Sequence, residues 1–145
     1  MSDIGKYIKL LENFMSREIM IEHDHGSAEG YVTDTNSEQF INWFNNRHKI
    51  YDQTMIDKFK DKYKSVAFLN NMNVDEDSRG NGYGSEILED FISDASMHYP
   101  DAIILIADTE ESQNDGFDLV KFYEGYDFEI VKRYSFGILM IMEML

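Results

Sequence analysis

A length of 145 residues and a mass of 17.0 kDa correspond to one domain, and an apolar content of 43% is enough for a hydrophobic core. The 13 Lys and Arg residues against 28 Asp and Glu residues give a net charge of −15, so nucleic acid and anionic membrane surfaces would repel the chain and neither is expected as a partner. The absence of cysteine excludes a disulfide scaffold, a thiolate nucleophile and a cysteine-bound zinc ion. No apolar run reaches the roughly 18 residues of a membrane span and the first residues show no signal-peptide pattern, so we expect one cytoplasmic domain over residues 1–145.

The first half of the chain predicts a helix, a pair of short strands and then more helix. Polar residues and a glycine at 24–27 separate two strand-like segments, as in a β-hairpin. The capping-box pattern at 35–38 predicts the start of a helix. The expected elements are an amphipathic helix over 3–16, strands over 18–22 and 29–33, a helix after 35–38 with Phe40, Ile41 and Phe44 on its apolar face, and a short helix around 55–63.

The second half predicts alternating strands and helices around a glycine-rich turn. The apolar run over 102–107 has the length of a strand that is covered on both faces. Because strands and helices alternate, at least one pair of strands is expected to be parallel, in an α/β or α+β domain. The expected elements are a strand from 65 to about 74, a turn at 80–84, a helix with Ile87, Leu88, Phe91, Ile92 and Ala95 on its apolar face, the strand over 102–107, a short helix around 119–123, and two closing strands over 128–134 and 136–144.

The segment 74–86 partly fits a calcium-binding loop. Asp75, Asp77, Gly80 and Glu86 occupy positions 1, 3, 6 and 12 of the EF-hand pattern. However, Arg79 stands at position 5, where its cation would oppose the metal ion, and the preceding residues predict a strand instead of a helix. We therefore disfavour a calcium site.

The same segment also partly fits a dinucleotide-binding turn, because Gly80, Gly82 and Gly84 lie between a strand and a helix. The GxGxxG pattern requires a third glycine where this chain has Ser85, and no convincing acidic strand end follows about 20 residues later. This interpretation is disfavoured as well.

The third interpretation of this turn is a cradle for the pyrophosphate of an acyl-coenzyme A. Arg79, Gly82 and Gly84 form an Arg-x-x-Gly-x-Gly motif between strand and helix, in which glycines admit phosphates to the backbone and the helix start attracts anions. The motif resembles the signature of the GNAT acyltransferase superfamily. The later segment Phe122-Tyr123-Glu124-Gly125-Tyr126-Asp127-Phe128 resembles the Phe-Tyr-Glu-x-x-Gly-Phe segment of that family, with Asp127 in place of the usual glycine.

The resemblance covers about residues 65–145 and implies a GNAT-like fold, with a central mixed, mostly antiparallel sheet flanked by helices. It implies a cofactor-binding core over 65–145 and a variable, acceptor-side half over 1–64, in which the helical region 35–64 departs from the usual family order. It also implies acetyl-CoA as co-substrate and Tyr123 as the catalytic residue that protonates the leaving sulfur. The cofactor-binding residues implied are Met72, Asn73, Val74, Arg79, Gly80, Asn81, Gly82, Tyr83, Gly84 and Ser85.

A general base is not evident in the sequence. Polyamine-type relatives carry Leu-Glu-Asp where this chain has Leu69-Asn70-Asn71, and asparagine cannot accept the amine proton as a base. Asp108, Glu110, Glu111, His23 and His25 are candidates, and a base that acts through water is an equal alternative. The His23-Asp24-His25 segment lacks a third ligand, so no metal site is expected.

These observations predict an N-acyltransferase that moves an acetyl group from acetyl-CoA to an amine. The acidic charge favours a cationic acceptor, either a small amine or an amine of a peptide or protein. Two alternatives stay open: a non-catalytic acyl-CoA-binding domain with the same fold, and an acidic interaction protein that covers a basic partner. The sequence also leaves open whether the chain forms a homodimer.

Overall fold

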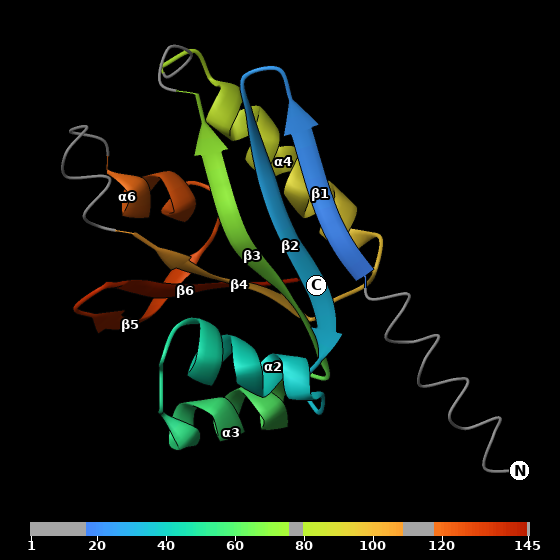
Figure 1. Cartoon of the computed structure of the whole chain (residues 1–145), viewed down its shortest axis with the longest axis vertical. Coiled ribbons are helices and arrows are strands. Elements are labelled where there is room, and N and C mark those ends of the chain that lie inside the picture. The colour runs from blue at the N-terminus through green and yellow to red at the C-terminus, as the bar shows by residue number, and fades with distance from the viewer. Residues whose placement is uncertain (1–16, 76–79, 109–117, 145) are drawn as a thin grey trace, which may run out of the picture.

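The computed structural model describes residues 17–75, 80–108 and 118–144, so the predicted helix over 3–16 lies outside the described part. The described residues form a six-stranded sheet in the order β1-β2-β3-β4-β6-β5, with helices on both faces (Figure 1). The strands are β1 (Arg17–His23), β2 (Gly26–Asp34), β3 (Ser65–Val74), β4 (Ala102–Ala107), β5 (Glu129–Tyr134) and β6 (Gly137–Glu143), and the helices are α2 (Glu38–Asn42), the π-helical turn η1 (Trp43–Arg47), α3 (Gln53–Lys62), α4 (Tyr83–Ser96) and α6 (Leu119–Glu124).

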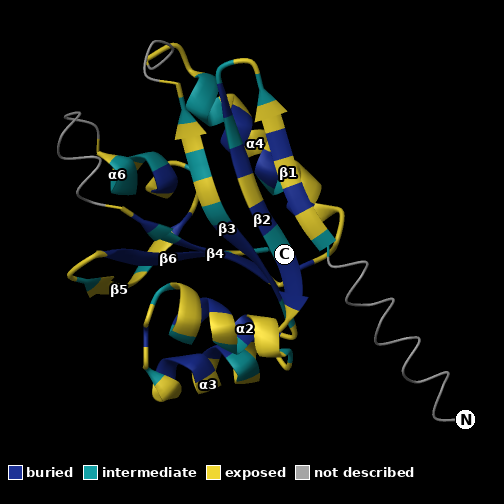
Figure 2. Cartoon of the chain, in the orientation of Figure 1, coloured by how far each residue is buried: buried dark blue, intermediate teal, exposed yellow. Residues whose placement is uncertain are grey.

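The sheet is mixed but mostly antiparallel, as predicted. Only β3 and β4 pair in parallel, and every other neighbouring pair is antiparallel. The strand β4 is buried along almost its whole length, which confirms the prediction of a strand covered on both faces (Figure 2). The order of a strand pair followed by helices before β3 also confirms the prediction for the first half of the chain.

Two hydrophobic clusters lie on opposite faces of the sheet. On one face, α4 packs across β1, β2 and β3, and the buried residues Leu88 and Phe91 of α4 belong to the same cluster as Tyr123 of α6. On the other face, the layer formed by α2, η1 and α3 covers Phe68 of β3 and Ile104 of β4. None of the described helices is long and apolar enough to cross a membrane.

The helix α2 starts later than the capping-box pattern predicts. Its N-cap is Ser37, whose hydroxyl oxygen accepts a hydrogen bond from the backbone N–H of Phe40 at 3.2 Å. Thr35 is not the cap because its hydroxyl donates to the backbone oxygen of Tyr63 at 2.7 Å, and its N–H donates to the oxygen of Lys64. Thr35 therefore joins the end of β2 to the end of α3 instead of starting a helix.

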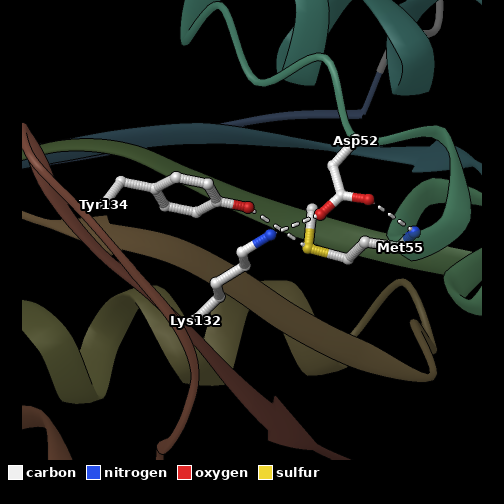
Figure 3. A network of polar contacts seen from close by, with 4 residues as sticks. All are labelled: Asp52, Met55, Lys132 and Tyr134. Atoms are coloured by element: carbon white, nitrogen blue, oxygen red, sulfur yellow. Dashed lines mark hydrogen bonds and ion pairs between the residues drawn. The ribbon is translucent and has the colours of Figure 1, made fainter.

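An ion pair joins the edge strand β5 to the start of α3 (Figure 3). Asp52 is the N-cap of α3: one carboxylate oxygen accepts the N–H of Met55 at 3.2 Å, and the other accepts Lys132 of β5 at 2.7 Å. The Tyr134 hydroxyl of the same strand donates to the sulfur of Met55 at 3.5 Å. These contacts hold the far end of the sheet against the α3 layer.

Candidate active site

The strands β3 and β4 separate after a short parallel pairing. They pair only from Val66 opposite Ala102 to Leu69 opposite Leu105. Beyond this point β3 continues beside β2 as far as Val74, whereas β4 continues beside β6, and the two strands diverge in Figure 1. Among the described residues, no strand therefore pairs with the β4-facing edge of β3 after Leu69. Backbone N–H groups on such an edge are available to a ligand.

A β-bulge at Asn70 marks the point of divergence. Glu29 pairs with Asn71 and the next residue of β2, Gly30, pairs with Leu69, so Asn70 is the extra residue on β3. A bulge bends a strand and increases its local twist, which separates β3 from β4. Gly30 permits a close approach here, since a Cβ atom at this position would lie 1.9 Å from the backbone oxygen of Phe68.

The bulge is supported from the α2 side of the sheet. The indole N–H of Trp43 donates to the side-chain oxygen of Asn70 at 2.8 Å, and the Trp43 ring stacks on Phe68 with a centroid distance of 4.2 Å. His48 packs against the same indole at 4.3 Å, and burial, followed by the nearby charge of Arg47, lowers its pKa to about 4. Trp43 is 1% exposed, so it is a core residue that positions the bulge and not the wall of a pocket.

The glycine-rich turn enters α4 through two left-handed residues. Gly80 has φ of 88° and Gly82, the N-cap of α4, has φ of 81°, a region that glycine adopts without strain. Gly82 provides no side-chain cap, and no atom of the described residues lies within 4 Å of a Cβ placed at either glycine. The first-turn N–H groups of this 14-residue helix, at the positive end of its dipole, are thus open to an anion. Arg79 lies outside the described residues, whereas the exposed Asn81 lies within the turn.

Three segments that are distant in sequence meet at the start of α4. A Cβ atom on Gly84 would lie 3.6 Å from a methyl group of Val74, at the end of β3, and 3.8 Å from the ring of Phe122 on α6. Tyr83 stacks on His25 of the β1–β2 turn at 4.0 Å, and Ser85 completes the first turn. The structure therefore brings together the end of β3, the glycine-rich turn and the aromatic segment predicted from the sequence. Met72 and Asn73 lie on the part of β3 that continues beyond its pairing with β4.

Tyr123 lies on α6 and is 5% exposed. Its ring contacts Phe122 and Phe128 at centroid distances of 5.4 Å and 5.6 Å. Burial alone raises the pKa of its phenol, and no described residue forms a hydrogen bond with its hydroxyl group. At neutral pH the group is therefore protonated and able to donate.

The structure distinguishes among the candidate bases. His23 forms a 2.7 Å contact with Asp90 of α4, and His25 stacks on Tyr83. Each histidine thus has a structural partner, and the two do not converge on a common ligand. Asp108 directly follows β4, whereas Glu110 and Glu111 lie outside the described residues. Within the described ranges, no three side chains are grouped as metal ligands.

Sequence analysis missed a carboxylate beside the bulge. Glu29 lies directly opposite Asn71, whose side-chain amide donates to it at 2.5 Å. Both residues line a groove of about 440 Å³ on the face of the sheet opposite α4. The alternation of side chains between the two faces along β2 indicates which face Glu29 occupies. Its pairing with Asn71, however, depends on the register between β2 and β3. The full lining consists of Met20, Glu22, Ser27, Glu29, Asn71, Met72 and Asn73.

Neither a protein-family model nor a curated protein sequence matches this chain. Solved structures do match. A chain of the NatC complex bound to Gag peptide and CoA matches at 16% sequence identity over 81% of this chain, with a TM-score of 0.51. Arabidopsis thaliana NAA60 in complex with acetyl-CoA matches at 10% sequence identity over 82% of this chain, with a TM-score of 0.55. The Drosophila melanogaster polyamine N-acetyltransferase matches at 6% identity over 85% of the chain with a TM-score of 0.61. This chain covers 61%, 65% and 72% of those three chains, respectively. The fold is thus that of the GNAT N-acetyltransferases, as the sequence predicted.

Proposed function

We propose that this protein is an N-acetyltransferase that moves an acetyl group from acetyl-CoA to an amine. The observation that carries this proposal is the meeting of the end of β3, whose β4-facing edge no described strand pairs with, and the open first turn of α4. Similar folds in the NatC complex and in NAA60 were solved with CoA and with acetyl-CoA bound, which supports the choice of cofactor.

The described residues fit a long, anionic thioester cofactor. The extended backbone of Met72, Asn73 and Val74 would hold the amide-containing arm of the cofactor by hydrogen bonds along the strand edge. The turn and the start of α4 would hold its pyrophosphate, because N–H groups and the helix dipole both favour an anion there. The residues assigned to this cradle are Arg79, Gly80, Asn81, Gly82, Tyr83, Gly84 and Ser85.

Tyr123 would be the general acid of the reaction. Acetyl-CoA supplies the acetyl group and a thiolate leaving group, and a phenol kept protonated by burial is suited to donate a proton to that sulfur. The free donor capacity of the hydroxyl supports this role, because no described residue competes for its hydrogen bond.

A non-catalytic acyl-CoA-binding domain is the second candidate. Neither residue at the bulge is a carboxylate: Asn70 accepts the indole N–H of Trp43, and Asn71 donates to Glu29. Both candidates require acetyl-CoA binding, but only the enzyme transfers the acetyl group. Turnover of acetyl-CoA with a panel of primary amines separates them.

Titration calorimetry with acetyl-CoA tests the cofactor site, and Ser85→Asp is the informative variant. A carboxylate in the first turn should stabilise α4 by about 0.3–1 kcal/mol through the helix dipole. The same charge should repel the pyrophosphate and weaken binding about fivefold or more, since the repulsion between two partly exposed unit charges is on the order of 1 kcal/mol or more. Stability and affinity should therefore change in opposite directions.

Gly84→Ala is the matched control. Its added Cβ makes only ordinary van der Waals contacts, at 3.6 Å from Val74 and 3.8 Å from Phe122. We expect unchanged affinity for acetyl-CoA. If wild-type protein does not bind acetyl-CoA, or if the folded Ser85→Asp variant binds it as tightly as wild type does, the proposed cofactor site is wrong.

A further inference from the structure

An acidic groove lies on the same strand as the proposed cofactor site. It occupies the face of β1, β2 and β3 opposite α4, where Figure 2 shows exposed and half-buried positions on the upper parts of these strands. Its volume of about 440 Å³ is within the usual range for small-molecule sites. Met72 and Asn73 belong both to the groove lining and to the part of β3 whose β4-facing edge is unpaired among the described residues. A molecule in the groove would thus lie next to the cofactor strand.

The strand register places two carboxylates at a defined spacing in this groove. Glu29 lies between Met20 and Asn71 in one cross-strand row, and Glu22 lies opposite Ser27 in the next row. Glu22 and Glu29 are therefore diagonal neighbours, with backbone positions about 7–8 Å apart. The amide of Asn71 donates to one oxygen of Glu29 and so orients this carboxylate at the bulge.

Neither carboxylate is neutralised by a described residue. The groove lining contains no Lys, Arg or His. Asp90, Asp52 and Glu143 form ion pairs with other described residues, and none of these three acids lines the groove. Met20 lies beside the two carboxylates with 59% of its surface exposed, which provides an apolar surface between two negative charges.

We propose that this groove binds the acceptor as an alkyl diamine, with one ammonium group at Glu29, the other at Glu22, and the methylene chain across Met20. The inference rests on the proposed function and names its substrate class. The group at Glu29 lies at the bulge, beside the strand edge that holds the cofactor. It reacts after it has lost one proton to water, so that the N–C bond forms while the C–S bond of the thioester breaks, and the second proton of the amine leaves to water as the amide forms. Positions 70 and 71 hold asparagine, and the neighbouring strand β2 supplies the carboxylate of Glu29 at this point.

The test compares acetylation of 1,4-diaminobutane and 1-aminobutane by wild type, Glu29→Gln and Glu22→Gln. Both substitutions keep the shape of the side chain, and a glutamine oxygen at position 29 still accepts the bond from Asn71. Glu18→Gln is the control, because Glu18 is exposed on the same face of β1 but lies outside the groove, opposite Tyr31.

We expect wild type to favour the diamine in kcat/KM by about fivefold, the upper range for one partly exposed ion pair. Glu22→Gln should remove this preference by lowering kcat/KM for the diamine, whereas Glu29→Gln should lower kcat/KM for both amines. Glu18→Gln should change neither value by more than a minor amount.

Equal kcat/KM for the two amines in wild type, or identical behaviour of Glu22→Gln and Glu18→Gln, would overturn the proposal. Calorimetry distinguishes the two levels of failure. A protein that binds acetyl-CoA and acetylates amines without dependence on Glu22 and Glu29 contradicts only the groove assignment. A protein that does not bind acetyl-CoA contradicts the proposed function as well.

Discussion

Removal of a single oxygen atom by Tyr123→Phe tests the proposed general acid. The ring of Tyr123 is packed between Phe122 and Phe128 and is 5% exposed, and phenylalanine preserves all of these contacts. No described residue bonds to the hydroxyl, so its loss breaks no hydrogen bond within the described part of the protein. A large effect on catalysis without a change in stability would therefore be assigned to the reaction itself.

The expected effects on stability and on rate differ in size. Phenylalanine keeps the packing of the ring, so the free energy of unfolding should change by no more than about 1 kcal/mol, the size of one hydrogen bond. General acids contribute about 10²–10⁴-fold to the rate, which corresponds to about 3–5 kcal/mol in the activation barrier. We thus expect kcat to fall by at least a hundredfold, with little change in the affinity for acetyl-CoA.

The assay measures kcat with saturating acetyl-CoA and 1,4-diaminobutane, together with urea denaturation of the same samples. Tyr126→Phe is the control, because the Tyr126 hydroxyl donates to Glu89 at 3.3 Å and that bond belongs to the surface of α4. The control should lose at most about 0.5–1.5 kcal/mol of stability and none of its activity. An unchanged kcat in Tyr123→Phe, or a loss of stability without a loss of rate, would refute the role of Tyr123 as acid and leave it as a packing residue.

Three further predictions concern stability and pH, each measured by urea denaturation. Asp52→Ala should lower the free energy of unfolding by about 1–2 kcal/mol, and Asp52→Asn by less because the amide oxygen still caps α3. The hydrogen bond from Lys132, followed by that from the Met55 N–H, lowers the pKa of Asp52, so this contribution should be present above pH 3.8 and lost as the pH falls below it. Burial lowers the pKa of His48 to about 4, so the folded protein favours the neutral imidazole. The free energy of unfolding should therefore decrease as the pH falls from 6.5 toward 4 in wild type, but not in His48→Gln. Burial, with the hydrogen bond to Glu143, raises the pKa of Tyr63 to about 12, so wild type but not Tyr63→Phe should lose stability as the pH rises from 10 to 12.

The parts of the fold that sequence predicts are those set by local patterns. The apolar run of β4, the amphipathic face of α4 and the glycine-rich turn each depend on residues a few positions apart. The positive φ angles of Gly80 and Gly82 are local requirements of the same kind. For this reason the strand–turn–helix unit was predictable close to its observed bounds.

The details that depend on distant contacts were not predictable in this way. Thr35 matches a capping pattern, yet its hydroxyl donates a hydrogen bond to the carbonyl of Tyr63, 28 positions away. The N-cap of α2 is therefore Ser37. The bulge at Asn70 is stabilised by the hydrogen bond from Trp43, and no local sequence pattern on β3 predicts it. The same bulge determines which residue of β2 lies opposite Asn71, so the pairing of Glu29 with Asn71 emerged only from the register of the sheet.

The importance of charge, as opposed to strand position, can be tested by moving the carboxylate across the strand pair. Directly opposed residues have Cβ atoms about 4.5–5.5 Å apart, so Asn71→Asp combined with Glu29→Gln returns a carboxylate to the same part of the groove. The double variant should regain roughly half, on a logarithmic scale, of the kcat/KM for 1,4-diaminobutane that Glu29→Gln loses, because the ion pair is restored without its original geometry. Asn71→Asp alone places two like charges opposite each other and removes the amide donor of Glu29, so it should lower stability without improving turnover. If the double variant is no more active than Glu29→Gln, the groove does not bind the acceptor through a negative charge at this position. That result would contradict the assignment of the groove from its charge and from the strand register.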